Sequence, residues 1–404
     1  MLNYEFTEQA KTRTVYPNFS MAEYEARYRR IRAMMDKEGL DCLVLFATGK
    51  EMQQKNARYI SGWADGIQQY AVFPRHGDPT LFVSISPHGL CAMLYSHLRD
   101  VRWAPNEADG VADRIVEAGC AKGSIGIVGR DKRTFSTLPY DHFERLKQRL
   151  PEARWSFVTA KYEKVRAIKS EEEIAFYRKG AEITDKCMQA LVDATRVGAA
   201  EYELYAAITA ESWRNNALPI FSLLGSTPMA DPTMPYPWRV PSERRIQKGD
   251  LILNELSMSY SGCSGQLIRP IAVGKPTPRF QKMYDLAEDV FRRVAEVIKP
   301  GCSKADVLKI SAAIPEAGYT IEAPIIHGWD DKAESPHWGI PGRDVAGHII
   351  EDERLEENQL IMIEPNPCTP DYRAGIFLGD VGVVRKDGWH SLHRFPLEFV
   401  VVDG

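Results

Sequence analysis

Residues 164–174 constrain the fold most strongly, because they mark where a long helix must begin in the middle of the chain. Ser170 and Glu173 form a capping-box pattern, in which each side chain accepts a hydrogen bond from a free backbone N–H group at the helix N-terminus. The apolar positions that follow predict a helix to about Ala194. The pattern divides the chain into two predicted domains, residues 1–160 and residues 161–404.

Helix and strand patterns alternate in the first domain. Ser20 and Glu23 form another capping-box pattern, and apolar residues recur near helical spacing from there to Gly39. Short apolar runs bounded by polar residues predict strands at residues 42–46, 70–73, 80–85 and 125–128. This alternation predicts an α/β domain.

The second domain combines strands with amphipathic helices. Apolar runs predict strands at residues 251–256, at residues 267–273 and through the tail from 359 to 401. A helix is predicted from residue 278 to about residue 298, where Pro300 and Gly301 follow. Residues 218–241 contain six prolines, so this segment is predicted to be a loop at the surface or lining a site.

Composition argues against two classes of partner. The chain has 51 Lys and Arg against 55 Asp and Glu residues, so it lacks the basic excess typical of nucleic-acid-binding proteins. No run of about 18 apolar residues occurs, which argues against a membrane span. The seven cysteines form no C-x-x-C pair, and the N-terminus does not resemble a signal peptide. We expect a cytoplasmic protein with free thiols that binds neither nucleic acid nor membrane.

Four segments carry a resemblance to a known family: residues 165–174, residues 248–255, His327-Gly328 and residues 361–365. In these segments the chain resembles the aminopeptidase P, prolidase and creatinase superfamily (peptidase family M24), which has the pita-bread fold. The resemblance implies an α+β architecture, with an N-terminal creatinase-like α/β domain followed by a C-terminal pita-bread domain. It also implies a homodimer that acts on a small-molecule substrate.

Metallopeptidases of this superfamily hold two divalent ions with two Asp, one His and two Glu residues. The resemblance maps these ligands onto Glu255, Gln266, His327, Glu364 and Gly379. Gln266 offers only a neutral oxygen and Gly379 has no side chain, so both bridging carboxylates are missing. Asp380, the next residue, would point to the opposite face of a strand. We therefore expect no metal and no other cofactor, although Glu255, His327 and Glu364 also match a known mononuclear ligand set.

Three residues are candidate catalytic groups: His327, Glu364 and Glu334. An imidazole exchanges protons near neutral pH, and a carboxyl group buried at the end of a strand suits a general acid or base. The alternatives are a core histidine that bonds to the backbone and a carboxylate that pairs with Arg269. Glu334 stands seven positions after His327, where peptidases of the superfamily usually have a second His. Its alternative is a solvated charge beside Asp330.

Aromatic and polar residues near the mapped site are candidates for substrate binding. Aromatic rings bind planar groups and cations, although core packing explains about half of such residues. Arg58 and Trp63 fall near positions where creatinase supplies contacts from a neighbouring subunit. The full set is Glu255, Tyr236, Trp238, Trp329, His337, Trp338, Arg58 and Trp63.

Creatinase is the metal-free precedent in the superfamily, and it cleaves a C–N bond of a small guanidino compound. Trp238 replaces its catalytic His and Ile268 replaces a substrate-binding Glu, which argues against creatine as the substrate. The sequence predicts a metal-independent, creatinase-like hydrolase that cleaves a C–N bond in a small, planar or aromatic non-peptide substrate, and metallopeptidase activity is not expected. The alternatives are a lyase that breaks C–C, C–O or C–S bonds, a catalytically inactive binding module, and residual prolidase activity.

Overall fold

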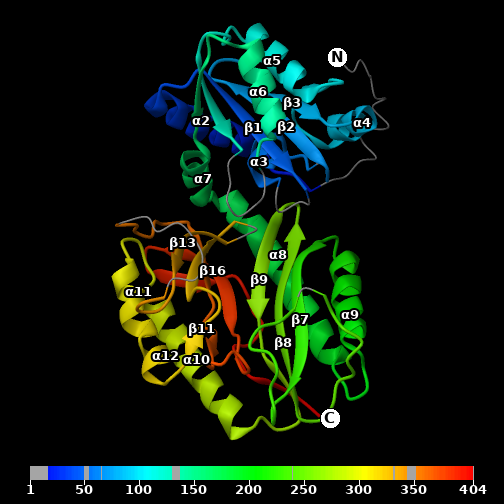
Figure 1. The fold of residues 1–404 in the computed structure, drawn as a ribbon, viewed down its shortest axis with the longest axis vertical. Coiled ribbons are helices and arrows are strands. Elements are labelled where there is room, and N and C mark those ends of the chain that lie inside the picture. Colours follow the sequence, from blue (N-terminus) through cyan, green and yellow to red (C-terminus); the bar gives the residue numbers. More distant parts are fainter. Residues whose placement is uncertain are drawn as a thin grey trace. The chain divides into compact units, whose positions relative to one another are not determined.

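The structure is a computed structural model that describes residues 17–49, 54–64, 66–129, 137–238, 240–330, 333–343 and 352–403. The chain forms two compact units, Met1–Arg166 and Ala167–Gly404 (Figure 1). Helices and strands occur in both units, so the predicted α+β class is confirmed. Among the described residues, none of the helices has the length and apolar character needed to cross a membrane.

The first unit is built on a six-stranded sheet with the strand order β4-β3-β2-β1-β5-β6. Its strands are β1 (Cys42–Thr48), β2 (Gln68–Pro74), β3 (Thr80–Val83), β4 (Asp100–Trp103), β5 (Ser124–Val128) and β6 (Arg154–Phe157). Its helices are α2 (Met21–Glu38), α3 (Lys55–Ser61), α4 (Ser86–Tyr95), α5 (Glu107–Glu117), α6 (Tyr140–Arg149) and α7 (Thr159–Ala167). Alternate residues of β1 enter two separate cores, since Leu43 packs with Ile31 of α2 and Val44 packs with Val111 of α5.

The second unit is built on a ten-stranded sheet. Eight strands follow the order β13-β12-β14-β16-β9-β8-β10-β18, while β17 pairs with β16 and β7 pairs with β8. The bounds are β7 (Leu218–Pro228), β8 (Asp250–Tyr260), β9 (Cys263–Ile268), β10 (Ile271–Val273), β12 (Ile326–Trp329), β13 (Ala333–Trp338), β14 (Leu360–Ile363), β16 (Gly379–Arg385), β17 (Gly388–Ser391) and β18 (Val400–Val402). A separate pair consists of β11 (Thr320–Ile321) and β15 (Pro367–Cys368).

The helices of the second unit begin with α8, whose start was predicted from the capping box. The Ser170 N–H donates to Glu173 Oε2 at 2.9 Å, and the Glu173 N–H donates to Ser170 Oγ at 3.0 Å. The bounds are α8 (Glu171–Ala194), α9 (Glu201–Arg214), α10 (Pro278–Val297), α11 (Lys304–Ser311) and α12 (Ala313–Glu316).

Helices α8, α9 and α10 pack against the face of the ten-stranded sheet that lies opposite the candidate side chains. At Gly265 of β9, an added Cβ would lie 2.4 Å from Ala181 Cα of α8, so only glycine allows this close approach. Leu256 of β8 and Leu267 of β9 pack into the core that includes α8 and α9, and Ile361 of β14 packs into the core that includes α10. The residues that alternate with them point to the opposite face.

The proline-rich segment differs from the prediction. Its first eleven residues form β7, which pairs along its length with β8, so the predicted loop is wrong there. The described pairings place no other strand beside β7, and an edge strand tolerates prolines near its ends. Pro219 and Pro228 occupy these positions, and a register shift follows Pro219.

Candidate active site

The structure brings His327 and Glu364 together. His327 lies on β12, opposite His337 of β13 and Met362 of β14. Glu364 follows β14, and its N–H donates to Ile325 O at 2.8 Å, which fixes the backbone beside His327. His327 Nε2 and Glu364 Oε1 are 3.3 Å apart, and each side chain is only 4% exposed.

The hydrogen bond of His327 Nδ1 fixes the roles of the two ring nitrogens. His327 Nδ1 lies 2.9 Å from Gly328 O, and a carbonyl oxygen only accepts, so Nδ1 carries a hydrogen. The other ring nitrogen, Nε2, faces the Glu364 carboxyl group. A neutral imidazole has a lone pair on Nε2 and a carboxylate has lone pairs on Oε1, so these atoms form a hydrogen bond only when a proton lies between them. One proton between these two atoms would give either imidazolium and carboxylate or imidazole and carboxylic acid. A buried pair with one transferable proton can act as an acid or as a base.

His327 and Glu364 belong to a row of residues that crosses one face of the sheet. Glu364 lies beside Gly379 of β16, because a Cβ added at Gly379 would be 3.0 Å from Glu364 Cβ. Gly379 pairs with Ile268 of β9, and Gln266, two residues earlier, shares the face of Ile268. Gln266 then contacts Glu255 of β8 through a hydrogen bond from its side-chain amide. Backbone register thus assembles the five mapped positions, from Glu255 through Gln266, Gly379 and Glu364 to His327.

Glu255 is held at one end of this row by neutral donors. The Tyr236 hydroxyl donates to Glu255 Oε2 at 2.8 Å, and Gln266 Nε2 donates to Glu255 Oε1. The Tyr236 ring packs against Phe377, with ring centroids 5.2 Å apart. Because each carboxylate oxygen accepts a bond from a separate group, Glu255 has a fixed orientation.

The side chains of this row do not fit two metal ions. The Gln266 amide directs an N–H group at Glu255 Oε1, and an N–H group cannot be a metal ligand. At Gly379, an added Cβ would lie 2.5 Å from Met362 Cε and 2.7 Å from Ile363 O, so neighbours already fill the space of a further ligand. Within the described ranges, no group of three or more His, Cys, Asp and Glu side chains could hold a metal ion.

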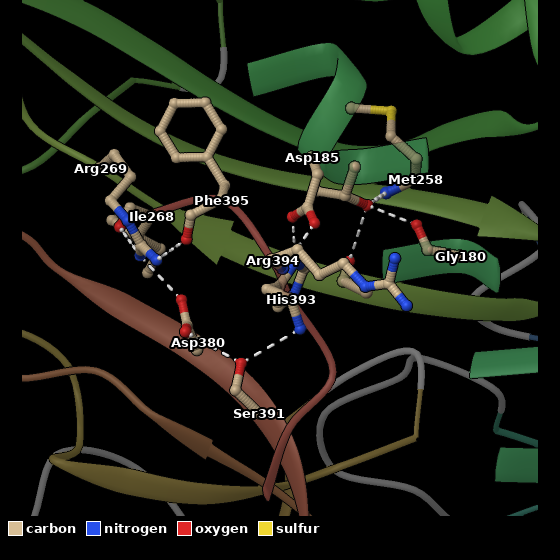
Figure 2. A network of polar contacts seen from close by, with 12 residues as sticks. Gly180, Asp185, Met258, Ile268, Arg269, Asp380, Ser391, His393, Arg394 and Phe395 are labelled. Atoms are coloured by element: carbon tan, nitrogen blue, oxygen red, sulfur yellow. Dashed lines mark hydrogen bonds and ion pairs between the residues drawn. The ribbon is translucent and has the colours of Figure 1, made fainter. Parts of the chain in front are cut away.

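Asp380 does not replace the missing ligand, because it points to the opposite face of the sheet. There its Oδ1 atom forms an ion pair of 2.7 Å with Nη1 of the fully buried Arg269 (Figure 2). Ser391 Oγ donates to Asp380 Oδ2 at 3.0 Å in the same network. Arg269 is therefore paired with Asp380, and the alternative in which it neutralises Glu364 is wrong.

The three candidates on β13 lie in different environments. His337 pairs with His327 across the strands, and the two rings stack with centroids 6.0 Å apart. Trp338 pairs with Ile326 and packs into the hydrophobic core, so the structure does not place it in the row. The backbone of Glu334 belongs to β13, but its side chain lies outside the described residues.

The remaining candidates for substrate binding lie in different parts of the structure. Trp329 lies two residues after His327 on the same face, with ring centroids 5.9 Å apart, and its Nε1 donates to Ser264 O at 2.8 Å. Trp238 is 58% exposed. Arg58 and Trp63 belong to the first unit, where Arg58 lies in α3 and Trp63 stacks on Tyr95.

Two groups of residues escaped the sequence analysis. Asp330, named above only as a neighbour of Glu334, is buried and forms an ion pair of 3.0 Å with the Lys169 ammonium group. The sequence did not reveal this pair, because its members are far apart in the chain and Asp330 stands among other charged residues. Ser257 and Ser259 are buried on the same face as Glu255, and their spacing of two residues along a predicted strand was the available signal.

Two family models match the chain. The model of metallopeptidase family M24 matches residues 175–391, and that of the Creatinase/Prolidase N-terminal domain matches residues 27–168. The curated Xaa-Pro dipeptidase of Pyrococcus horikoshii is 24% identical over 376 residues, which cover 93% of this chain and 98% of the relative. That of Pyrococcus furiosus is 25% identical over 290 residues, which cover 71% of this chain and 78% of the relative.

Solved structures show the same fold. The prolidase from Pyrococcus horikoshii has a TM-score of 0.75 at 24% identity and covers 93% of this chain and 100% of that chain. The X-Pro aminopeptidase from Thermotoga maritima has a TM-score of 0.79 at 18% identity and covers 93% of this chain and 99% of that chain. With the family matches, they confirm the predicted N-terminal creatinase-like domain and C-terminal pita-bread domain.

The curated relatives contradict the predicted function. Both are dipeptidases, enzymes that hydrolyse a peptide bond, and one aligns with almost the whole chain. The predicted metal-independent hydrolase of a non-peptide C–N bond is therefore wrong, as are its lyase and inactive-module alternatives and the expectation against metallopeptidase activity. That prediction gave more weight to the two missing metal ligands than to the resemblance of the chain to the peptidases of the family.

Proposed function

Since the chain belongs to metallopeptidase family M24, we propose that it hydrolyses the peptide bond of small peptides. Dipeptides with proline in the second position are the first substrates to test, because the curated relatives with long alignments are Xaa-Pro dipeptidases. The observation that carries the proposal is the buried His327–Glu364 pair, whose facing atoms are 3.3 Å apart.

The chemistry of peptide hydrolysis requires a transferable proton. The leaving nitrogen of an amide must be protonated as the C–N bond breaks, because an amide anion is a very poor leaving group. We assign this role to a proton held between His327 Nε2 and Glu364 Oε1, whose separation is 3.3 Å. The pair then accepts the proton released by the attacking water, which restores its starting state.

The other end of the row supports substrate orientation. Glu255 is held by Tyr236 and Gln266, so it presents a carboxylate of fixed direction on the same face as His327. Trp329 lies beside His327 and is anchored to the backbone of β9 through Ser264 O. Side chains with fixed orientations, such as Glu255 and Trp329, hold a substrate with its scissile bond near the proton donor.

Matched variants test the role of the pair. Glu364→Gln keeps the size of the side chain but removes the proton-transfer group, and His327→Gln removes the imidazole. Each change should lower kcat for a cleaved dipeptide by about 10²- to 10⁴-fold, the usual contribution of general acid–base catalysis. The exposed residues His390 and Glu296 provide the controls His390→Gln and Glu296→Gln, which should leave kcat unchanged. A loss below about threefold in well-folded Glu364→Gln protein would remove the pair from the mechanism.

A further inference from the structure

Two thiols meet at the start of β1 in the first unit. Cys42 is the first residue of β1 and is fully buried, while Cys120 follows α5 and is partly exposed. Cys120 Sγ lies 3.6 Å from Asp41 O, which belongs to the peptide bond that joins Asp41 to Cys42. The two thiols also form a hydrogen bond with each other. Residues far apart in the sequence thus place their sulfur atoms side by side.

The end of α5 holds Cys120 in this position. The Cys120 N–H donates to Ile115 O at 3.0 Å, and the Gly119 N–H donates to Val116 O at 2.9 Å. These two bonds form the Schellman arrangement that ends many helices, and Gly119 adopts the left-handed conformation that it requires, with φ +73°. The Gly123 N–H then donates to Cys120 O at 2.9 Å. Backbone hydrogen bonds therefore fix Cys120 on both sides.

Cys42 has an equally fixed position in the sheet. It pairs with Pro74 of β2 on one side and with Ile125 of β5 on the other. Its side chain belongs to the hydrophobic core that includes residues of α5 and α6, and Cys120 packs against this core. The sulfur atoms can therefore react with each other while the strand pairing and the end of α5 stay as they are.

The two thiols differ in protonation and in access to solvent. The hydrogen bond with Cys42 lowers the pKa of the Cys120 thiol to about 7. Nearby guanidinium groups of Arg114 and Arg75 act in the same direction, whereas burial and the Asp41 carboxylate oppose them. The same hydrogen bond, together with burial, raises the pKa of the Cys42 thiol well above its ordinary value. Near neutral pH, Cys120 is thus partly an accessible thiolate, and Cys42 is a buried protonated thiol in contact with it.

This arrangement is typical of cysteines that react with oxidants. The thiolate is the nucleophilic form of cysteine, and an adjacent second thiol captures the first oxidation product as a disulfide. All seven cysteines lie among the described residues, and five of them are buried. The other two are Cys120 and the exposed Cys91. Cys91 therefore provides an internal comparison for simple exposure.

We propose that Cys42 and Cys120 form a reversible oxidation site, at which hydrogen peroxide converts the two thiols into an intramolecular disulfide. The Cys120 thiolate attacks one peroxide oxygen, the O–O bond breaks, and the other oxygen leaves as hydroxide, which takes a proton from solvent to form water. Cys120 then carries a sulfenic acid.

The second step joins the two residues. Cys42 Sγ attacks Cys120 Sγ, the S–O bond of the sulfenic acid breaks, and hydroxide leaves with the proton of the Cys42 thiol as a second water. The two sulfur atoms together lose two electrons, and the peroxide gains them. A dithiol reductant restores both thiols by exchange. The inference is independent of the proposed peptidase function, because both cysteines belong to the first unit.

Peptide mapping of the peroxide-treated full-length protein tests the inference. Reduced protein is freed of reductant, treated with hydrogen peroxide at pH 7, alkylated with iodoacetamide and digested with trypsin without reduction. Cleavage after Lys and Arg places Cys42, Cys91 and Cys120 on separate peptides, residues 38–50, 76–99 and 115–122. We expect a cross-linked species of the first and third peptides, lighter than their sum by two hydrogen atoms. Dithiothreitol should convert it back to the separate peptides.

Serine variants assign the role of each thiol. Cys42→Ser should abolish the cross-link and leave a Cys120 sulfenic acid that dimedone labels. Cys120→Ser should abolish the cross-link and leave Cys42 unmodified, because Cys42 is buried. Cys91→Ser is the matched control and should leave the yield of cross-link unchanged. The wild-type map decides the inference even where a variant fails to fold.

Three results would overturn the inference. In the first, Cys42 and Cys120 of the wild-type protein remain separate thiols while Cys91 is oxidised. In the second, Cys120 is oxidised to a sulfinic acid and no cross-link to Cys42 forms. In the third, the cross-link joins either residue to a different cysteine.

Discussion

The buried Arg269–Asp380 ion pair gives a prediction with a magnitude that follows from the structure. The guanidinium group is fully buried, and its Nη1 atom lies 2.7 Å from Asp380 Oδ1 (Figure 2). Asp380→Ala would leave this cation without its counter-charge. Removal of one partner from a buried ion pair typically costs about 3–5 kcal/mol.

The backbone around Arg269 places the expected loss at the lower end of this range. Arg269 also donates to four carbonyl oxygens, those of Ile268, Gly379, Phe395 and Pro396. These acceptors remain in the variant and still solvate part of the charge. We therefore expect Asp380→Ala to lower the free energy of unfolding by about 3 kcal/mol, roughly a 150-fold change in the ratio of folded to unfolded protein.

Urea unfolding followed by circular dichroism measures this loss. Asp387→Ala is the matched control, because Asp387 is exposed and bonds only to the exposed His390 among the described contacts of its side chain. The double variant Arg269→Met with Asp380→Leu should lose less stability than Asp380→Ala, because it leaves no unpaired charge. A loss below about 1 kcal/mol for Asp380→Ala, or a double variant less stable than it, would refute the reasoning.

Two further predictions concern a crowded glycine and a reactive thiol. Gly379→Ala should lower the free energy of unfolding by about 1–3 kcal/mol, because its Cβ would collide with Met362 Cε and Ile363 O. Thermal unfolding checks this, and unchanged stability would contradict the observed packing. The hydrogen bond with Cys42 lowers the pKa of the Cys120 thiol to about 7, so the thiolate fraction should rise between about pH 6 and 8. Alkylation by iodoacetamide, measured by mass spectrometry, should reach half of its maximal rate near pH 7, and a midpoint near the ordinary thiol value of 9.0 would contradict the interaction.

The helices and most strands of the second unit could be predicted because local signals determine them. The capping box at Ser170 gives the start of α8, and the apolar run before Glu364 gives β14. The strand β7 could not be predicted from proline content, because whether proline is tolerated depends on whether the strand lies at an edge of the sheet. Edge position is a property of the whole sheet topology.

The candidate site was predicted in part. Resemblance placed His327 and Glu364 in one site, and the structure puts their facing atoms 3.3 Å apart. The pairing of Arg269 with Asp380 depends on which face of the sheet each side chain occupies. A shift of one residue in the strand register would move a side chain to the other face. The buried Asp330 was missed for a related reason, since its partner Lys169 comes from another element.

Release of free proline from Xaa-Pro dipeptides by the purified full-length protein tests the central claim most directly. The proposed function predicts that proline accumulates with time in proportion to protein concentration, and that Glu364→Gln reduces this rate by about 10²-fold or more while His390→Gln does not. Absence of proline release across a panel of dipeptides that vary the first residue, from wild-type protein with an intact thermal transition, would contradict it.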